Sequence, residues 1–243
     1  MENHKVVSHD EWTDTRTQFL AREKELTRLR DQLSQQRRDL PWERVDKSYI
    51  FDGPSGHESL SDLFAGRRQL IVYHFMFGPD WEAGCPSCSL FADGFNGIIV
   101  HLNQRDVTFV AASRAPFSRL DAYRKRMGWS FKWVSSAANA FNRDYQVSFT
   151  PEDLASGEAC YNYTKQKLWG AEMPGISVFY KDPSRHVYHT YSAYGRGLDM
   201  LMPNYQFLDL VPKGRDEADQ KPHPQAWVRR HDEYGDEARS RRS

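Results

Sequence analysis

The sequence predicts a mixed α/β fold, because apolar strand-like segments alternate with helical patterns along the chain. Residues 69–77 (QLIVYHFMF) are the most apolar run, and their β-branched and aromatic content favours a central strand buried on both faces. Residues 106–112 (DVTFVAA) predict a second buried strand, and residues 175–180 and 186–192 predict a hairpin. The strand–helix–strand order requires parallel pairing, and the hairpin adds antiparallel strands to the same sheet.

An amphipathic helical arm is predicted within residues 1–40. Ser8 and Glu11 have the spacing of a capping box, and Pro41 stands where the helix must end. The apolar residues of the arm recur at roughly helical intervals as far as about position 36: Trp12, Phe19, Leu20, Leu26, Leu29 and Leu33. So narrow a stripe fits packing on the chain's own domain, which we favour, and also a homodimer contact.

Residues 41–212 are predicted to form the main domain. Its other expected elements are strands at 49–51 and 131–134 and helices at 59–65, 86–103, 117–127 and 198–210. Residues 137–172 show no clear period, and we interpret them as an insertion that contains some helix. Residues 213–243 carry charges of both signs and few large apolar side chains, which predicts a mobile tail.

Composition excludes several classes of function. The 33 Lys and Arg balance 33 Asp and Glu among 243 residues, so no positive field favours a nucleic acid partner. No stretch approaches the roughly 20 apolar residues of a membrane span, and the N-terminus lacks the apolar run of a secretory signal. Three Cys cannot build a disulfide framework, so we expect a reducing, cytoplasmic location.

The candidate catalytic residues are Cys85 and Cys88, in a Cys-Pro-Ser-Cys motif directly after the most apolar strand and at a predicted helix start. Unpaired N–H groups and the positive end of the helix dipole lower the pKa of a first-turn thiol. Cys85 is then the nucleophile, and Cys88, one turn on, closes the disulfide. Pro86 suits the first helical turn. A zinc site would need two further ligands, and the third cysteine, Cys160, stands alone. Inert cysteines are the other alternative.

The candidate substrate-binding residues are Trp81, Pro86, Met173 and Pro174. Trp81 stands just before the motif and either covers the site or packs in the core. Pro174 enters the strand at 175–180, where the ladder tolerates a proline. A trans bond would simply end the loop, whereas a cis bond would turn the neighbouring backbone toward the cysteines to pair with an extended substrate.

The order of buried strand, CxxC helix and proline before a hairpin resembles the thioredoxin fold over about residues 49–192. More narrowly, the chain resembles the bacterial thioredoxin-like family catalogued as domain-of-unknown-function family 899, over roughly residues 12–215. The matching segments are the helical arm, LIVYHFMFGPDW with GCPSCS, DVTFVAASRAP, YSAYGRGLDML and YQFLDLVPKGR. This resemblance implies a mixed central sheet flanked by helices, a cis-Pro strand after the insertion, and redox chemistry.

We therefore predict a thiol–disulfide oxidoreductase that forms a mixed disulfide with a protein or small-molecule substrate and needs no bound metal or flavin. A thiol peroxidase and a non-catalytic binding module of this fold are the alternatives. The opening strand and loop also resemble peroxiredoxins, but Glu82 stands where their pocket has a Thr hydroxyl. Arg114 is the candidate for the arginine that such a pocket needs. His74, inside the buried strand, is expected to be a core histidine rather than a proton relay.

Overall fold

The computed structural model describes residues 4–235, and the chain forms two compact units that divide between Pro41 and Trp42. The first unit contains α1 (His9–Arg38). As the sequence predicts, Ser8 caps this helix, and its Oγ accepts a hydrogen bond from the Glu11 backbone N–H at 3.2 Å. No residue of α1 is buried, so its own unit leaves the apolar stripe uncovered. Within residues 4–235, no helix has both the length and the apolar content to cross a bilayer.

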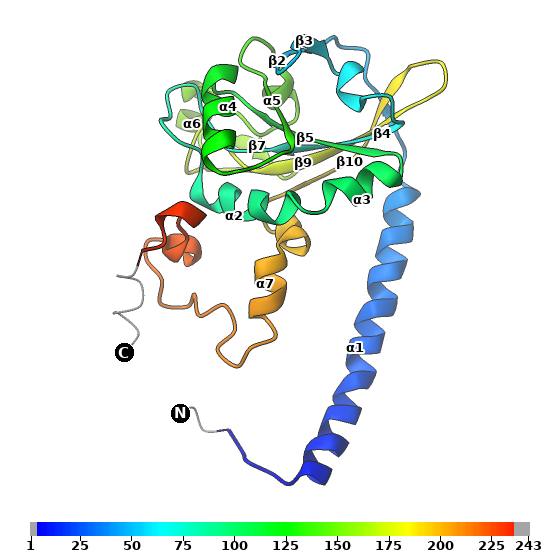
Figure 1. Ribbon diagram of the computed structural model, residues 1–243, viewed down its shortest axis with the longest axis vertical. Coiled ribbons are helices and arrows are strands. Elements are labelled where there is room, and N and C mark those ends of the chain that lie inside the picture. Colours follow the sequence, from blue (N-terminus) through cyan, green and yellow to red (C-terminus); the bar gives the residue numbers. More distant parts are fainter. Residues whose placement is uncertain (1–3, 236–243) are drawn as a thin grey trace. The chain divides into compact units, whose positions relative to one another are not determined.

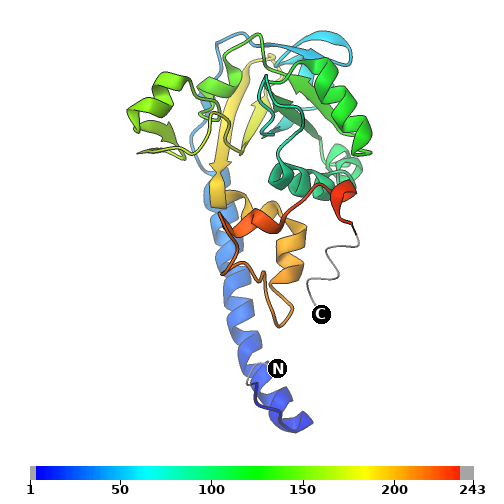
Figure 2. The same cartoon turned by 90° about the vertical axis from the view of Figure 1, so that its left-hand side faces the viewer.

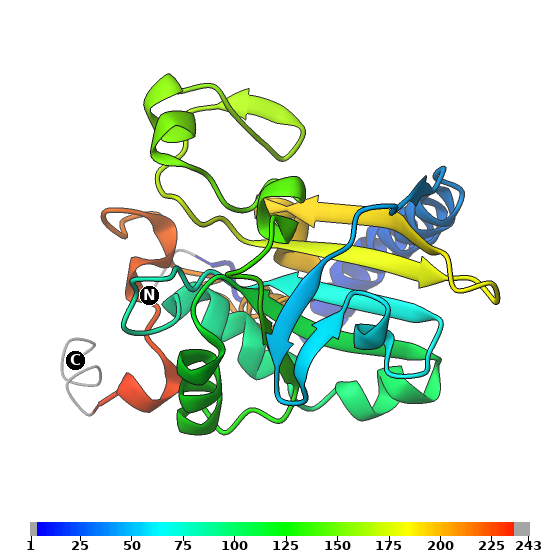
Figure 3. The same cartoon turned by 90° about the horizontal axis from the view of Figure 1, so that it is seen from above.

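The second unit is built on an eight-stranded mixed sheet (Figures 1 and 3). Across the sheet the strands are β1 (Glu43–Arg44), β10 (Val187–Tyr194), β9 (Gly175–Lys181), β4 (Gln69–His74), β5 (Val107–Ser113), β6 (Lys132–Ser135), β2 (Ile50–Gly53) and β3 (Gly56–Ser59). β4 pairs with β5 and β5 with β6 in parallel, and every other pairing in this sheet is antiparallel. The predicted parallel centre and antiparallel hairpin are both confirmed.

Helices connect the central strands in the order that defines the fold. The short helix η1 (Asp62–Phe64) comes before β4. The others follow their strands: α2 (Pro86–Phe95) and α3 (Ile99–Gln104) come after β4, α4 (Phe117–Arg126) after β5, and η2 (Gly195–Leu201) and α7 (Pro203–Leu208) after β10. The spatial order β10-β9-β4-β5, with β9 antiparallel to β4 and a helix after β4, β5 and β10, is thioredoxin-like. The predicted fold class is confirmed in this respect.

Side chains of β4 alternate between two cores, as the two-residue period of a strand requires. Tyr73 and, just beyond the strand, Phe75 belong to the core that includes α2 and α4 side chains. Leu70 and Val72 point to the opposite face, where they pack with η1 and with α5 (Phe141–Asp144). Burial on both faces explains why the segment is apolar throughout, and it places α2, with its cysteines, against the Tyr73 face.

The insertion at 137–172 contains more structure than the sequence indicates. Besides α5 it forms α6 (Pro151–Ser156) and a separate hairpin of β7 (Ala159–Tyr161) and β8 (Thr164–Gln166), and Figure 2 shows this region projecting beside the sheet. Its side chains form a small core that includes Tyr161 and that is completed by Tyr194 at the end of β10. The strands have three residues each, too short to establish a period.

Two segments near the C-terminus differ from expectation. The single helix predicted at 198–210 is two short helices, because Met202 has an extended backbone and Pro203 starts a new helix. Residues 224–234, predicted to be part of a mobile tail, instead contact the domain through η3 (Pro224–Trp227) and η4 (His231–Glu233). Val228 is only 3% exposed in the core beside α2, so an apolar side chain packs this segment against the domain. Residues 236–243 of the predicted tail lie outside the described residues.

Candidate redox site

Cys85 and Cys88 lie where the loop after β4 turns into α2, as predicted. Cys85 is the N-cap residue of this helix, and Pro86 occupies its first turn, where no intrahelical N–H bond is lost. The Cys85 N–H donates to the Met76 carbonyl at 3.1 Å, and the Met76 N–H donates to the Cys88 Sγ at 3.5 Å. These two contacts fold the loop back on the end of the strand and hold both cysteines against it.

The two thiols have opposite properties. Cys85 is partly exposed and Cys88 is buried, at 2% exposure, and neither is in a disulfide. The pKa of Cys85 falls to about 7, chiefly because the Cys88 thiol donates a hydrogen bond to it, and burial opposes this shift. The backbone N–H groups of Cys88 and Ser87 and the charge of Arg230 lower it further. Burial, together with the neighbouring Cys85 sulfur, raises the pKa of Cys88 well above its ordinary value.

Tyr73 lies beneath the pair and was not predicted to belong to the site. Its side chain is fully buried, and its hydroxyl faces the Cys88 sulfur. Among residues 4–235, no group lies at the distance and angle of a regular hydrogen bond to this hydroxyl. Burial first, and then Cys88, raises the pKa of this phenol well above the usual value. Tyr73 therefore stays a neutral hydroxyl beside Cys88. The only signal in the sequence was its place on the α2 side of the buried strand.

A polar network supports the loop from the side of α4. The Ser89 Oγ donates to the Cys85 carbonyl at 2.9 Å and is 2.9 Å from the Tyr123 hydroxyl. Gly84 fits closely between aromatic rings, since a Cβ at this position would lie 2.6 Å from Phe75 and 2.9 Å from Tyr123. Packing therefore favours glycine before the first cysteine, because any larger residue would require these rings or the loop to shift.

Two arginines distant in sequence hold the carbonyl groups of the same loop. Arg119 of α4 donates to the carbonyls of Pro79 and Trp81 at 2.8 and 2.7 Å. Arg230 donates from Nε and Nη2 to the Gly84 carbonyl at 3.1 and 2.8 Å. Neither arginine was predicted, because each reaches the loop from an element whose position depends on the tertiary fold.

The predicted substrate-binding residues divide into two groups. Pro86 adjoins Cys85, and the half-buried Trp81 packs over Gly78 at the edge of the core. Met173 is buried in the core of the insertion, and the Pro174 carbonyl accepts a hydrogen bond from the Tyr161 hydroxyl at 2.7 Å.

The prediction of a cis bond between Met173 and Pro174 is wrong. This bond is trans, and within residues 4–235 the one cis bond joins Lys221 to Pro222. With its carbonyl occupied by Tyr161, the backbone at Pro174 does not offer an extended substrate the expected partner.

The groups considered for peroxide chemistry are engaged elsewhere or face solvent. Arg114 pairs with Glu172 at 3.2 Å, and this buried carboxylate also accepts a hydrogen bond from Ser148 at 2.5 Å. Burial raises the pKa of Glu172. Glu82 is exposed, so its carboxylate is solvated beside the loop. Cys160 is exposed and lies 3.6 Å from the Gln146 Oε1. Among residues 4–235, no three His, Cys, Asp or Glu side chains are grouped as metal ligands would be.

His74 belongs to a hydrogen-bonded chain on the other face of the sheet. Its Nε2 is 2.8 Å from the Ser177 Oγ, which is 2.9 Å from the Ser192 Oγ, which in turn is 2.7 Å from the His189 Nε2. The buried Nδ1 of His74 has no partner among the described residues. Burial, and then the neighbouring His189, lowers the pKa of His74 to about 3, so the ring is neutral. This agrees with the expectation of a core histidine.

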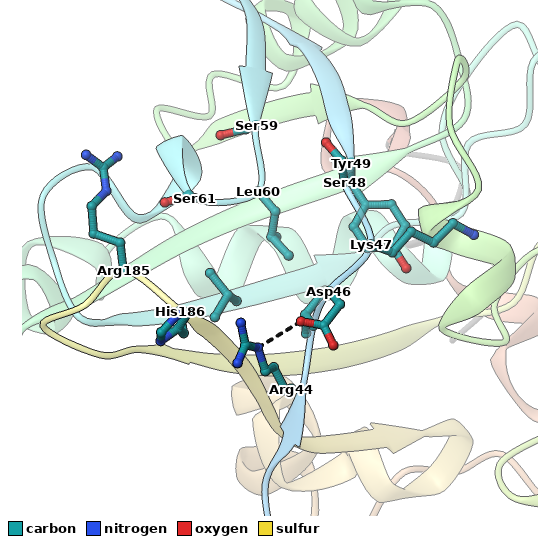
Figure 4. Close-up of a pocket in the computed structure, with 12 residues that line it drawn as sticks. Arg44, Asp46, Lys47, Ser48, Tyr49, Ser59, Leu60, Ser61, Arg185 and His186 are labelled. Atoms are coloured by element: carbon teal, nitrogen blue, oxygen red, sulfur yellow. Dashed lines mark ion pairs between the residues drawn. The ribbon is translucent and has the colours of Figure 1, made fainter.

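A surface hollow of about 310 Å³ lies away from the cysteines, between β1, the start of β2 and the β9–β10 turn (Figure 4). Arg44 and Asp46 form an ion pair of 2.8 Å at its edge, and the Lys47 and Arg185 side chains extend to opposite sides. None of the residues that line it belongs to the candidate redox site. We assign no function to this hollow.

Comparison with known protein families gives a match over residues 1–234 to bacterial proteins of unknown function, DUF899. The chain belongs to this family. Curated proteins gave no match. Among solved structures, the peroxidoxin BcpB from Mycobacterium tuberculosis is 12% identical with a TM-score of 0.46, and the match covers 67% of this chain and 94% of that one. Peroxiredoxin Q from Xanthomonas campestris is 15% identical with a TM-score of 0.47, and here the shares are 67% and 95%.

Proposed function

We propose that the protein is a thiol–disulfide oxidoreductase in which Cys85 is the nucleophile and Cys88 the resolving thiol. The observation that carries this proposal is the asymmetry of the pair. Cys85, at the helix start, is partly exposed and has a pKa of about 7, whereas Cys88, one turn further on, is buried and has a pKa well above its ordinary value. A thiolate near neutral pH combines availability with nucleophilic strength, and a buried second thiol is protected from competing reactions.

The reaction follows from this asymmetry. The Cys85 thiolate attacks one sulfur of a substrate disulfide, forms a mixed disulfide, and releases the other sulfur as a thiolate that takes a proton from water. The negative charge on Cys85, which helps to keep Cys88 protonated, disappears in this step, so Cys88 loses its proton more easily. The Cys88 thiolate then attacks the Cys85 Sγ and expels the second substrate sulfur as a thiolate, which takes up a proton equivalent to the one that Cys88 lost. Two electrons pass to the substrate, and a Cys85–Cys88 disulfide remains for an external dithiol to reduce.

The surroundings of the pair support a disulfide substrate over a peroxide. Polarising an O–O bond requires a hydroxyl and a guanidinium with donors directed at the nucleophile. The guanidinium groups of Arg119 and Arg230 donate to loop carbonyls, and that of Arg114 donates to Glu172. A reductase role in a reducing compartment, the cytoplasm, fits a pair of free thiols. Acting on a protein or a small-molecule disulfide is equally consistent with this site.

Trapping the mixed disulfide tests the proposal. The background is Cys160→Ser, which removes the exposed third thiol. In this background Cys88→Ser is expected to accumulate disulfide-linked species from a lysate or with a model disulfide, and reduction releases them. Cys85→Ser is the matched control and should trap nothing. Equal trapping by both variants, or by neither, would falsify the assignment of roles.

Two further outcomes separate the alternatives. In the Cys160→Ser protein, which keeps both Cys85 and Cys88, the alkylation rate of Cys85 should rise with pH around a midpoint of about 7. A midpoint near the free-thiol value of about 8.5 would instead favour a non-catalytic binding module. Consumption of peroxide with a dithiol donor, at a rate that competes with disulfide reduction, would favour the thiol peroxidase.

A further inference from the structure

We propose that the C-terminal segment, residues 224–234, is a functional part of the redox site, and that its docking is coupled through Arg230 to the charge on Cys85. The proposal rests on the function proposed above. It makes Arg230 a positioning residue that acts on the nucleophile through the loop backbone and through its positive charge.

The first observation is where Arg230 donates its hydrogen bonds. Two of its nitrogen atoms donate to the carbonyl of Gly84, the residue directly before the nucleophile. Its third nitrogen atom, Nη1, donates to both carboxylate oxygens of Glu233 at 2.9 and 3.1 Å. Because all three nitrogen atoms have protein acceptors, Arg230 is committed to holding the loop rather than to binding a substrate. The cation nevertheless lies close enough to Cys85 to lower the pKa of the thiol.

The second observation is that the segment is anchored on α2, which carries Cys88, and on α4, whose Tyr123 supports the same loop. Arg126 of α4 forms a two-pronged ion pair with Asp232, at 2.7 and 3.1 Å, and also contacts Glu233 at 2.9 Å. His231 lies 2.8 Å from a carboxylate oxygen of Asp93 on α2. Figures 1 and 2 both show the segment, in red, beside α2. The guanidinium groups of Arg126 and Arg230 each make paired hydrogen bonds, and together they hold the segment at a fixed distance from the loop.

The third observation is the burial of Val228, which is 3% exposed within the core that contains Cys88. An apolar anchor in the same core means that the segment is not held by surface ion pairs alone, which individually contribute little. Arg229, the next residue, is exposed and donates within the segment, to the carbonyls of Ala226 and Val228. Adjacent arginines therefore differ in one respect that matters, since only Arg230 reaches Gly84.

Coupling between the segment and Cys85 must be reciprocal. The positive charge of Arg230 favours the Cys85 thiolate, so the thiolate favours the docked segment. Oxidation to the Cys85–Cys88 disulfide, or attachment of a substrate, removes that negative charge and weakens docking. The other titratable groups facing the nucleophile are Cys88 of α2, Tyr73 of β4 and, through Ser89, Tyr123 of α4.

The test compares Arg230→Gln with Arg229→Gln in the Cys160→Ser background, reading Cys85 alkylation against pH by peptide mass. Arg230→Gln is expected to move the midpoint of about 7 upward by a fraction of a pH unit, because the charge of Arg230 lowers the pKa of Cys85 less than the hydrogen bonds to the thiolate do. Arg230→Lys keeps the positive charge and should move the midpoint less than Arg230→Gln does. Arg229→Gln should leave the midpoint where it is. Identical midpoints for both glutamine variants would overturn the proposal. A midpoint near the free-thiol value of about 8.5 in the Cys160→Ser protein itself would instead overturn the proposed function.

A second measurement needs no variant in the segment. Amide hydrogen exchange across residues 224–234 is compared in the reduced protein and in the protein with the Cys85–Cys88 disulfide, whose formation is verified by mass. Faster exchange in the oxidised form supports the coupling. The same exchange in both forms, with the disulfide present, overturns it.

Discussion

Acid should destabilise this protein through one buried ring, that of His74. The pKa of His74 is about 3 in the folded chain against 6.5 in the reference state, so between these values the unfolded chain binds a proton that the native chain excludes. Stability from this group is complete above about pH 6.5 and falls as the pH falls toward the folded pKa. Between about pH 7 and about pH 5 the loss amounts to roughly 2 kcal/mol, from about 1.4 kcal/mol for each pH unit below the unfolded pKa.

Urea unfolding at these two pH values measures the effect in the wild type and in His74→Leu. The variant loses the hydrogen bond to Ser177 at both values, so its stability is lower throughout, but the contribution of His74 to the pH dependence disappears. The wild type should therefore lose about 2 kcal/mol more than the variant on acidification. His101→Gln, at an exposed position on α3, is the control and should follow the wild type. The reasoning fails if His74→Leu and the wild type lose the same free energy.

Three further outcomes are expected. Gly84→Ala should destabilise the protein by about 1–3 kcal/mol in urea unfolding and slow Cys85 alkylation, because the added Cβ lies within 2.6 Å of a buried ring; Gly97→Ala, where nothing lies within 4 Å, should do neither. Cys88→Ala should raise the pH midpoint of Cys85 alkylation more than Cys88→Ser, since a serine hydroxyl still donates a hydrogen bond, and equal midpoints would contradict that origin of the low pKa. If α1 forms a homodimer through its stripe, Leu26→Lys, at a side chain 58% exposed, should yield monomers in sedimentation velocity, and a monomeric wild type would refute the dimer.

Local patterns predicted the fold well where they also reflect the tertiary environment. The apolar run at 69–77 is buried on both faces because β4 lies in the middle of the sheet, so composition and position agree. The motif was readable because a loop joins the end of this strand to a proline between two cysteines at a helix start. The hairpin β7–β8 has no such signal, since its strands are too short to alternate. Arg230, 146 residues from Gly84, could not be assigned because its contact depends on how the chain returns to the sheet.

The cis-proline prediction failed for a reason that also locates the site more narrowly. It assumed that the loop before β9 faces the cysteines with free backbone groups, as the order of elements allows. The insertion changes this, because Tyr161 takes the Pro174 carbonyl and Met173 enters the core of the insertion. In the proposed reaction, substrate recognition would then depend on the loop and helix start around Cys85, whose backbone is held by Arg119, Arg230 and Ser89.

The low pKa of Cys85 has a different leading cause from the one that the sequence suggested. The helix N-terminus contributes through two backbone N–H groups, but the hydrogen bond from the Cys88 thiol is the larger effect. In the reaction proposed above, the resolving thiol of Cys88 therefore activates the nucleophile to which it later bonds, and the substrate is what it releases. Since the same proton stabilises the thiolate and must be lost before resolution, formation of the mixed disulfide is the event that frees Cys88, and the chemistry of the pair is ordered by one shared hydrogen bond.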